Sequence, residues 1–224
     1  MSEKLSNPYE RHIVVTDDGS TSLDIPEMNE MYHSRKGART ESIHVYIANG
    51  LKQIAAKSIA ILEVGLGTGL NALLSFYHAV QNDISLRYVA LEPFPLSIKE
   101  SGLLKFNAGK NDQDWIEKIH RSADQSDIAI TDHIVFRKEI TRLESFESDE
   151  RFDVIYFDAF APNKQSSPWV LSNIKKCYEL LKPGGCLTTY CAQGQFKRNL
   201  SEIGFQVTNP KGPMGKREIT VAYK

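Results

Sequence analysis

The sequence contains few cysteines and no long apolar run. Its three cysteines, Cys177, Cys186 and Cys191, form no Cys-x-x-Cys pair. This spacing disfavours a disulfide framework and a structural zinc site, so we expect free thiols in a reducing compartment and no bound metal. No stretch of about 18 apolar residues is present, which argues against a membrane span. The first eight residues lack the apolar core of a signal peptide, and these absences together predict a cytoplasmic protein that does not contact a membrane.

Charge of one sign is also scarce, because the formal net charge of the 224 residues is −1. The molecule as a whole is therefore not a basic nucleic-acid binder. Two segments nevertheless concentrate positive charge. Residues 31–40 contain no acid and carry Arg35, Lys36 and Arg39. Residues 193–217 contain one acid, Glu202, and carry Lys197, Arg198, Lys211, Lys216 and Arg217. The two segments could meet in a phosphate-facing patch, although charge alone favours ordinary solvated surfaces.

The most informative segment is an apolar run that ends at Glu63 and continues into glycines at alternate positions, Gly65, Gly67 and Gly69. Glycine has no Cβ, so the backbone there can adopt positive φ and a ligand can lie directly against it. A loop of this kind, at the carboxyl end of the first strand of an α/β sheet, indicates a site for a nucleotide-type cofactor.

Around this loop the apolar pattern alternates between strand and helix. Strands are predicted at 59–64, 86–91, 133–137, 153–157 and 186–190, with helices at 41–57, 70–81, 95–106, 168–181 and 194–203. The alternation predicts an α/β fold with a mostly parallel sheet. Segments 205–208 and 218–222 are expected to form a closing antiparallel pair, and residues 107–132 are ambiguous apart from a helix around Trp115 and Ile119.

The N-terminal part predicts a small β element. Segments 12–16 and 21–25 flank the turn Asp17-Asp18-Gly19-Ser20 and are expected to pair as a hairpin. A polar, glycine-containing loop follows over residues 30–39. We therefore divide the chain into an N-terminal extension, residues 1–40, and a main domain, residues 41–224.

A glycine-rich loop of this kind can belong to one of three types of cofactor site. A phosphate-binding P-loop needs Gly-Lys followed by Ser or Thr, whereas Gly69 is followed by Leu70 and Asn71, so that interpretation fails. A dinucleotide loop needs a glycine at the position of Leu70 and an apolar residue at that of Glu63, which weakens that interpretation without excluding it. The remaining pattern, Glu-x-Gly-x-Gly-x-Gly, resembles motif I of class I S-adenosylmethionine-dependent methyltransferases.

Acidic residues close four successive predicted strands, which supports a cofactor site at their carboxyl ends. These residues are Glu63, Glu92, Glu139 and Asp158. Glu92 stands where a ribose acceptor is expected, because a carboxylate can accept two hydroxyl hydrogen bonds. Glu139 could accept from the adenine amino group, and Asp158 would lie beside the reactive methyl.

A second unusual segment follows the strand that ends at Phe157. Asp158, Phe160, Pro162 and Lys164 occur within seven residues. Pro162 stiffens the backbone, Phe160 could stack on a base, and Lys164 could contact a phosphate. The alternative places Phe160 in the core and Lys164 in water, but the position of the segment favours the functional interpretation.

Several motifs together resemble the MnmC-type methyltransferase domain. They are Glu63–Asn71, Leu91–Leu96, Asp158–Lys164, Trp169, Lys182–Gly185 and Gly215–Glu218. That family makes 5-methylaminomethyl-2-thiouridine at the tRNA wobble position. The resemblance implies a Rossmann-like fold with a seven-stranded sheet whose terminal strand is antiparallel, and N-methylation of 5-aminomethyl-2-thiouridine by S-adenosylmethionine. Fused members add a flavin-dependent oxidase domain. Its absence here implies no FAD and a separate flavin-dependent or other tRNA-modifying enzyme acting upstream.

The resemblance also implies roles for individual residues. Glu63 would hold the methionine end of the cofactor, together with the glycine loop and Asn71. Glu92 would hold the ribose and Glu139 the adenine, although the family often has Gly-Asp-Ile where this chain has Lys138-Glu139-Ile140. Asp158 would be the catalytic acid nearest the acceptor amine. The residues expected to bind tRNA are Tyr32, Arg35, Lys36, Phe160, Pro162, Lys164, Lys197, Lys211, Lys216 and Arg217.

Two other functional classes stay open at this point. An aminopropyltransferase similar to spermidine synthases, or another small-amine methyltransferase, would use a related cofactor and an amine acceptor. A non-enzymatic RNA-binding module could keep the fold without the chemistry, but the row of acids at the strand ends argues against it.

Overall fold

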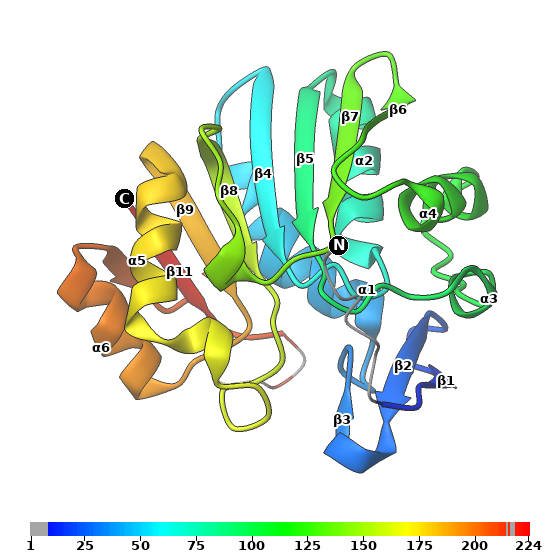
Figure 1. The fold of residues 1–224 in the computed structure, drawn as a ribbon, viewed down its shortest axis with the longest axis horizontal. Helices are drawn as coiled ribbons and strands as arrows, with labels where there is room; N and C mark the ends of the chain where they lie inside the picture. Colours follow the sequence, from blue (N-terminus) through cyan, green and yellow to red (C-terminus); the bar gives the residue numbers. More distant parts are fainter. Residues whose placement is uncertain (1–8, 214, 216–217) are drawn as a thin grey trace.

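The computed structural model describes residues 9–213, 215 and 218–224. Its main sheet has eight strands in the order β10-β11-β9-β8-β4-β5-β7-β6 (Figure 1). The strands are β4 (Ser58–Val64), β5 (Ser85–Leu91), β6 (Asp127–Thr131), β7 (Ile134–Glu139), β8 (Phe152–Phe157), β9 (Leu181–Thr189), β10 (Gln206–Thr208) and β11 (Thr220–Tyr223). The central pairs are parallel, whereas β6, β10 and β11 pair antiparallel with their neighbours.

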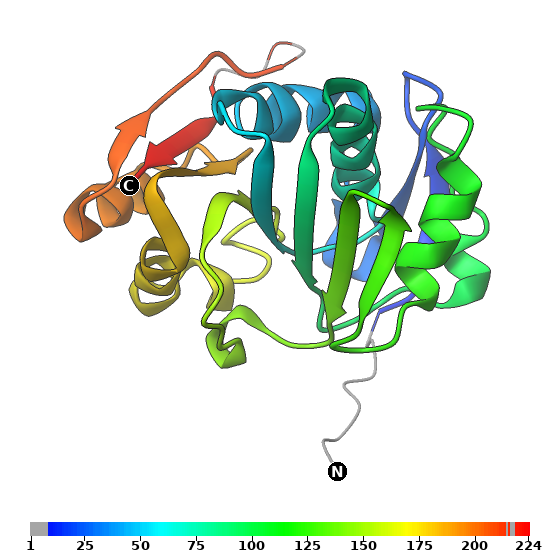
Figure 2. The ribbon, with the colours of Figure 1, turned by 90° about the horizontal axis from the view of Figure 1, so that it is seen from above.

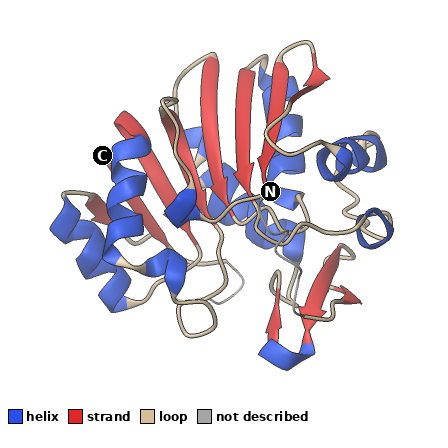
Figure 3. Cartoon of the chain, viewed as in Figure 1, coloured by secondary structure: helices blue, strands red, loops and turns tan. Residues whose placement is uncertain are grey.

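Helices cover both faces of this sheet (Figures 2 and 3). They are α1 (Ala38–Ser42), α2 (Leu70–Asn82), α3 (Ile98–Ser101), α4 (Asp112–Arg121), α5 (Leu171–Leu180) and α6 (Gly194–Ile203). A π-helical turn, η2 (Ile43–Ala48), continues α1 directly. One apolar core joins the sheet to η2, α2 and α4, and a second joins it to α5 and α6. Burial on both faces explains why the central strands are almost entirely apolar in sequence.

A small antiparallel sheet lies beyond the carboxyl ends of the central strands (Figure 1). It consists of β1 (His12–Val15), β2 (Thr21–Ile25) and β3 (Glu30–Met31). The Asp18 carboxylate in the β1–β2 turn accepts hydrogen bonds from the Thr16 hydroxyl at 2.9 Å, the Ser20 backbone at 3.1 Å and the Thr40 backbone at 2.9 Å. These bonds tie the hairpin to the start of α1, so the small sheet is attached to the main domain on the side where the cofactor loop is expected.

The structure confirms the predicted α/β class and corrects three details. The sheet has eight strands instead of seven, because the polar segment Asp127–Thr131 pairs as an antiparallel edge strand. The helix predicted over 41–57 ends at Ala48, and a Cβ on Gly50 would lie 2.4 Å from the Tyr46 carbonyl oxygen. The helix predicted over 95–106 shrinks to the four residues of α3, whose start is capped by a capping box between Ser97 at the N-cap and Glu100 within the helix.

Candidate active site

Strand register brings the predicted site residues to one edge of the sheet. Val64 lies opposite both Leu91 and Phe157, and Leu91 lies opposite Glu139. The chain leaves β4 for β5 on one side and later returns to β8 on the other, which creates the crevice where ligands bind in such sheets. The acids that follow these strand ends are therefore neighbours in space.

A cavity of about 520 Å³ opens at this edge. Its volume is that of a typical small-molecule site. The wall is formed by the glycine loop, the end of β5, segment 141–144, the segment from Asp158 to Pro168, and residues between Ile25 and Tyr46. The small N-terminal sheet thus supplies one part of the cavity wall, and the loops after the strands of the main sheet supply the rest.

The glycine loop leaves no room for side chains. Gly65 and Gly67 have φ of +94° and +53°, which L side chains rarely adopt. A Cβ on Gly65 would lie 2.7 Å from the Asp158 carbonyl oxygen, and one on Gly67 would lie 2.8 Å from the Tyr32 ring. The loop is therefore packed closely between Asp158 on one side and Tyr32 of the N-terminal extension on the other.

Glu92 holds the loop from the next strand. Its two carboxylate oxygens accept from the Gly67 backbone at 2.8 Å and the Phe94 backbone at 2.9 Å. Burial raises the pKa of Glu92, and these two donors oppose that effect by favouring the charged form. Glu92 lines the cavity, and a carboxylate has further lone pairs for ribose hydroxyls.

Asp158 accepts hydrogen bonds on both of its carboxylate oxygens. The Tyr46 hydroxyl donates to Oδ1 at 2.5 Å, and Asn71 Nδ2 donates to Oδ2 at 2.7 Å. Asn71 also donates to Glu63 at 2.9 Å, and the Tyr88 hydroxyl donates to the other Glu63 oxygen at 2.9 Å. A continuous chain of hydrogen bonds therefore runs from the buried core to the cavity.

The predicted site residues divide into three groups. Those that line the cavity are Tyr32, Arg35, Gly65, Gly67, Glu92, Asp158, Phe160 and Lys164. Those placed elsewhere among the described residues are Lys36, Glu63, Gly69, Asn71, Glu139, Pro162, Lys197 and Lys211. Lys216 and Arg217 lie outside the described residues. Glu92, expected to hold the cofactor, and Asp158, expected to lie beside the acceptor amine, are 66 positions apart in the sequence. Both line the same cavity.

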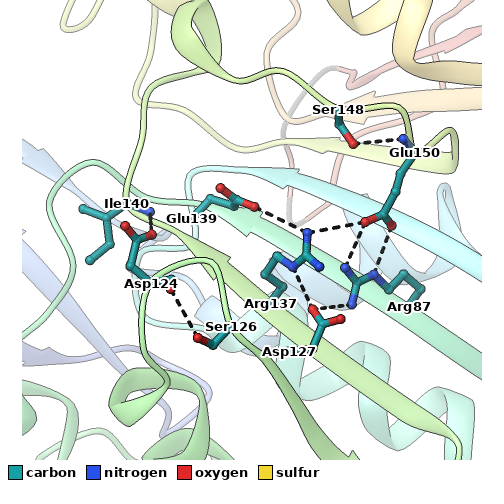
Figure 4. A network of polar contacts seen from close by, with 9 residues as sticks. All are labelled: Arg87, Asp124, Ser126, Asp127, Arg137, Glu139, Ile140, Ser148 and Glu150. Carbon is teal, nitrogen blue, oxygen red and sulfur yellow. Dashed lines mark hydrogen bonds and ion pairs between the residues drawn. The ribbon is translucent and has the colours of Figure 1, made fainter.

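Glu63 and Glu139 lie differently from the expectation. Glu63 is fully buried, and burial raises its pKa well above the usual range. Glu63 does not line the cavity and is linked to Asp158 through Asn71, which donates to both carboxylates. The Glu139 carboxylate points toward Arg137, 3.8 Å away, at the margin of an ion-pair network with Arg87 and Glu150 (Figure 4). The cavity wall beyond β7 is formed instead by residues 141–144.

Two of the predicted phosphate contacts are engaged within the protein. Lys164 donates to the Met28 carbonyl oxygen at 2.8 Å. Lys197 pairs with Glu218 at 2.6 Å. Arg35 is exposed at the cavity and Lys36 is exposed beside it, so this pair is the better placed for a polyanion.

Sequence inspection missed Tyr46, Arg11 and Arg142, which all line the cavity. The Arg11 side chain is only 3% exposed, donates to the Phe94 carbonyl at 2.5 Å, and lies 6.0 Å from the Tyr32 ring centroid. Arg142 lies 5.4 Å from the Phe94 ring centroid. No local pattern marks these residues, because each reaches the site through contacts distant in sequence.

The lining residues fit S-adenosylmethionine. Thr68 Oγ1 and Arg11 Nε are buried and lack a hydrogen-bond partner within the described part of the chain, so both are available to a polar ligand. The loop excludes side chains at Gly65 and Gly67, as a close backbone–ligand approach requires. Glu92 supplies a hydroxyl acceptor, and Asp158 supplies negative charge for a cationic centre.

The described residues give two further observations. None of their helices combines the length and the apolar character that crossing a bilayer would need. They also contain no cluster of three His, Cys, Asp or Glu residues that could hold a metal ion.

This fold and site define a class I S-adenosylmethionine-dependent methyltransferase. A family described as "S-adenosyl-L-methionine-dependent methyltransferase" matches residues 110–224, and the chain belongs to it. The crystal structure of MnmC2 from Aquifex aeolicus superposes with a TM-score of 0.79 at 23% identity, covering 97% of this chain and 72% of that one. The seven-strand count aside, the predicted fold class is confirmed.

Curated relatives confirm the resemblance to MnmC-type proteins. The "tRNA 5-methylaminomethyl-2-thiouridine biosynthesis bifunctional protein MnmC" of Cupriavidus necator is 29% identical over 88% of this chain, which spans 32% of that protein. An uncharacterised protein of Methanocaldococcus jannaschii is 27% identical over 96% of this chain and 60% of its own length. The chain therefore corresponds to about a third of the bifunctional relatives.

Proposed function

We propose that this protein methylates the aminomethyl nitrogen of 5-aminomethyl-2-thiouridine at the wobble position of tRNA, with S-adenosylmethionine as donor. The observation that carries the proposal is the Asp158 carboxylate, fixed by Tyr46 and Asn71 in a cavity shared by the glycine loop and Phe160. The names of the bifunctional relatives support the choice of acceptor.

In this proposal the donor half of the cavity is the glycine loop with Glu92. S-adenosylmethionine supplies a methyl group on a sulfonium centre. Gly65 and Gly67 let the nucleoside approach the backbone, and Glu92 accepts from the ribose hydroxyls. Thr68 and Arg11 offer their unpartnered polar atoms to the same ligand.

The acceptor half is formed by aromatic rings and Asp158. Tyr32 and Phe160 meet edge to face, with centroids 5.1 Å apart and an interplanar angle of 84°. A base turned out of the anticodon loop can stack on such a ring. Its amine must be unprotonated to react, so Asp158 orients the amine and offers a place for its proton. Correct orientation supplies much of the acceleration in a displacement of this kind.

RNA would reach the cavity across the exposed pair Arg35 and Lys36, whose phosphate contacts position the substrate without reading its sequence. The aminomethyl group must be made beforehand, so a separate flavin-dependent or other tRNA-modifying enzyme would act upstream. Such a pathway would place the protein in the cytoplasm, with tRNA as its partner.

Radiolabelled methyl transfer to tRNA that lacks the final modification tests this proposal. The wild-type protein should label this tRNA, and Asp158→Ala should lose transfer while still binding S-adenosylhomocysteine. Transfer of a propylamine group from decarboxylated S-adenosylmethionine to a polyamine would favour the aminopropyltransferase alternative. Labelling of small amines in place of tRNA would identify a small-amine methyltransferase, and RNA binding without any transfer would leave only the binding module.

A further inference from the structure

The segment 107–132, whose sequence is ambiguous, contains α4, and this helix packs directly against the glycine loop. A Cβ on Gly69 would lie 3.4 or 3.5 Å from three side chains of α4, those of Ile116, Ile119 and His120. Their spacing of i, i+3 and i+4 places them on one face of the helix. All three side chains are buried, so this face of α4 supports the third glycine of the loop from behind.

His120 also makes a directed contact with the loop. Its Nε2 lies 3.1 Å from the backbone carbonyl of Thr68, 52 positions earlier in the chain. A carbonyl oxygen can only accept a hydrogen bond, so the ring carries its proton on Nε2 and donates it. Burial lowers the pKa of His120 to about 4, which keeps the ring neutral near pH 7 and agrees with this single donor.

Lys138 of β7 fixes the end of α4 that carries His120. Its ammonium donates to the His120 carbonyl at 2.8 Å and to the Ile119 carbonyl at 3.4 Å. These carbonyls are among the last four of the helix, which lack intrahelical donors, and a cation is favoured at that end. Only 3% of Lys138 is exposed, so the contact is shielded from water. The central sheet therefore holds the glycine loop through the last turn of α4.

The loop is thus held from two sides. Glu92 accepts from the Gly67 backbone at 2.8 Å, and His120 donates to the Thr68 carbonyl. Thr68 lines the cavity, and its hydroxyl is buried without a hydrogen-bond partner within the described part of the chain. A buried hydroxyl without a partner is costly, so a polar ligand atom would complete it. Because the backbone around Thr68 is fixed, the direction of this hydroxyl is fixed as well.

We propose that His120 is a positioning residue for the cofactor, which holds the Thr68 carbonyl and thereby directs the Thr68 hydroxyl at a polar atom of S-adenosylmethionine. The inference rests on the proposed function only in its choice of methyl donor. It does not require that the acceptor be tRNA, because His120 and Thr68 act on the cofactor.

Calorimetric binding of S-adenosylhomocysteine to the full chain tests this role. His120→Leu removes the donor at similar volume and should weaken binding about fivefold to tenfold. His120→Gln keeps an N–H donor near the position of Nε2, so its affinity should stay within about twofold of the wild type. Thermal unfolding of each variant verifies that it is folded. If His120→Leu does not fold, His120→Met replaces it, because the unbranched side chain fits irregular spaces.

The Thr68 hydroxyl gives a readout that general stabilisation would not move. Thr68→Val removes the hydroxyl at nearly the same volume and should itself weaken binding about tenfold. In that background His120→Leu should weaken binding by less than about twofold, because no hydroxyl is left to direct. Independent effects on stability would instead add in the double variant.

Tyr77→Phe is the matched control for α4. The Tyr77 hydroxyl donates to the Asp112 carboxylate and accepts from the Asn111 backbone, both at 2.8 Å. These bonds hold the start of α4, at the end of the helix opposite His120. Their loss should lower the unfolding temperature and change the affinity by less than about twofold.

The inference is overturned if His120→Leu or Thr68→Val binds as tightly as the wild type. It is also overturned if His120→Gln or Tyr77→Phe loses as much affinity as His120→Leu, or if the His120→Leu effect keeps its full size in the Thr68→Val background. Binding that follows the expectation without methylation of tRNA would refute the proposed function and leave the role of His120 standing. Methylation of tRNA with unchanged binding in every variant would refute only the inference.

Discussion

The Lys164 ammonium lies 2.8 Å from the carbonyl oxygen of Met28, a residue 136 positions earlier in the chain. Glu30 lies 4.0 Å from the same ammonium. All three residues line the cavity. The contacts of Lys164 therefore join the segment that follows β8 to the N-terminal sheet across the site. The phosphate contact predicted for Lys164 stays a prediction, and the Met28 and Glu30 contacts show that Lys164 also helps to close the cavity wall.

Lys164→Met should therefore reduce stability. Loss of a charged hydrogen bond predicts a decrease of about 1–2 kcal/mol in the free energy of unfolding, measured with urea. Lys175→Met is a suitable control, because Lys175 is exposed and its ion pair with Glu179 is long, at 3.9 Å. Its loss should cost less than about 0.5 kcal/mol. Equal effects of the two substitutions would contradict the bridging role.

The glycine loop can be tested with two alanine substitutions of similar backbone strain. Gly65 and Gly184 have φ of +94° and +78°, but only the Cβ at Gly65 would meet another atom within 4 Å. Each substitution should cost about 1 kcal/mol or more of stability through strain. Gly65→Ala alone should also weaken binding of S-adenosylhomocysteine, by about tenfold or more, as measured by calorimetry. Equal affinities would show that the ligand does not lie on this loop.

Glu92 and Glu139 were both predicted to bind the cofactor, but of the two only Glu92 lines the cavity. Glu92→Gln loses a carboxylate oxygen that accepts from a backbone amide and that is proposed to accept from the ligand, so affinity for S-adenosylhomocysteine should fall about tenfold to a hundredfold. Glu139→Gln should change that affinity less than about twofold, because its carboxylate faces Arg137. A larger loss with Glu139→Gln than with Glu92→Gln would support the predicted adenine role of Glu139.

Two histidines, the half-buried His33 and the buried His120, predict acid sensitivity. Burial lowers the pKa of His33 and that of His120 to about 4, from an ordinary value of 6.5. The unfolded chain binds protons below pH 6.5 while the folded chain does not, so stability falls with decreasing pH until both states are protonated near pH 4. Each histidine should cost about 2 kcal/mol by pH 5.

Urea unfolding at pH 7, 6 and 5 checks this slope. His120→Gln should flatten it by about half, since His33 remains. His120 Nε2 donates to the Thr68 carbonyl at 3.1 Å, so a second proton would go to Nδ1, which is buried and has no hydrogen-bond partner among the described residues. A slope independent of His120 would show that this ring accepts a proton without unfolding.

The exposed pair Arg35 and Lys36 predicts salt-dependent RNA binding. Reversal of both charges to glutamate should weaken tRNA affinity and reduce the slope of log affinity against log salt by about two, one for each lost phosphate contact. Filter binding at several salt concentrations measures the slope, and Lys175→Glu serves as the surface control. An unchanged slope would mean that RNA approaches by another face.

Local sequence was sufficient for the elements with strong periodicity. The strand 58–64, the glycine loop and the helix 70–82 were predicted almost to the residue, because burial on both faces of the sheet demands continuous apolar runs. The edge strand β6 was missed because only one of its residues is buried, so its sequence carries no such constraint. The helix was predicted to extend too far beyond Ala48, because the close packing around Gly50, where a Cβ would lie 2.4 Å from the Tyr46 carbonyl oxygen, depends on contacts that the local sequence does not show.

The sequence by itself determined the α/β class, the cofactor loop and the positions of Glu92 and Asp158, since each is a consequence of where a buried strand ends. Only the tertiary structure decided which neighbours these acids have. Tyr46 reaches Asp158 across 112 positions, and Arg11 reaches Phe94 across 83. Glu63 and Glu139 end their strands as predicted, yet their side chains point into the core and toward Arg137. Contacts between distant segments depend on how the layers pack, and no local pattern encodes that packing.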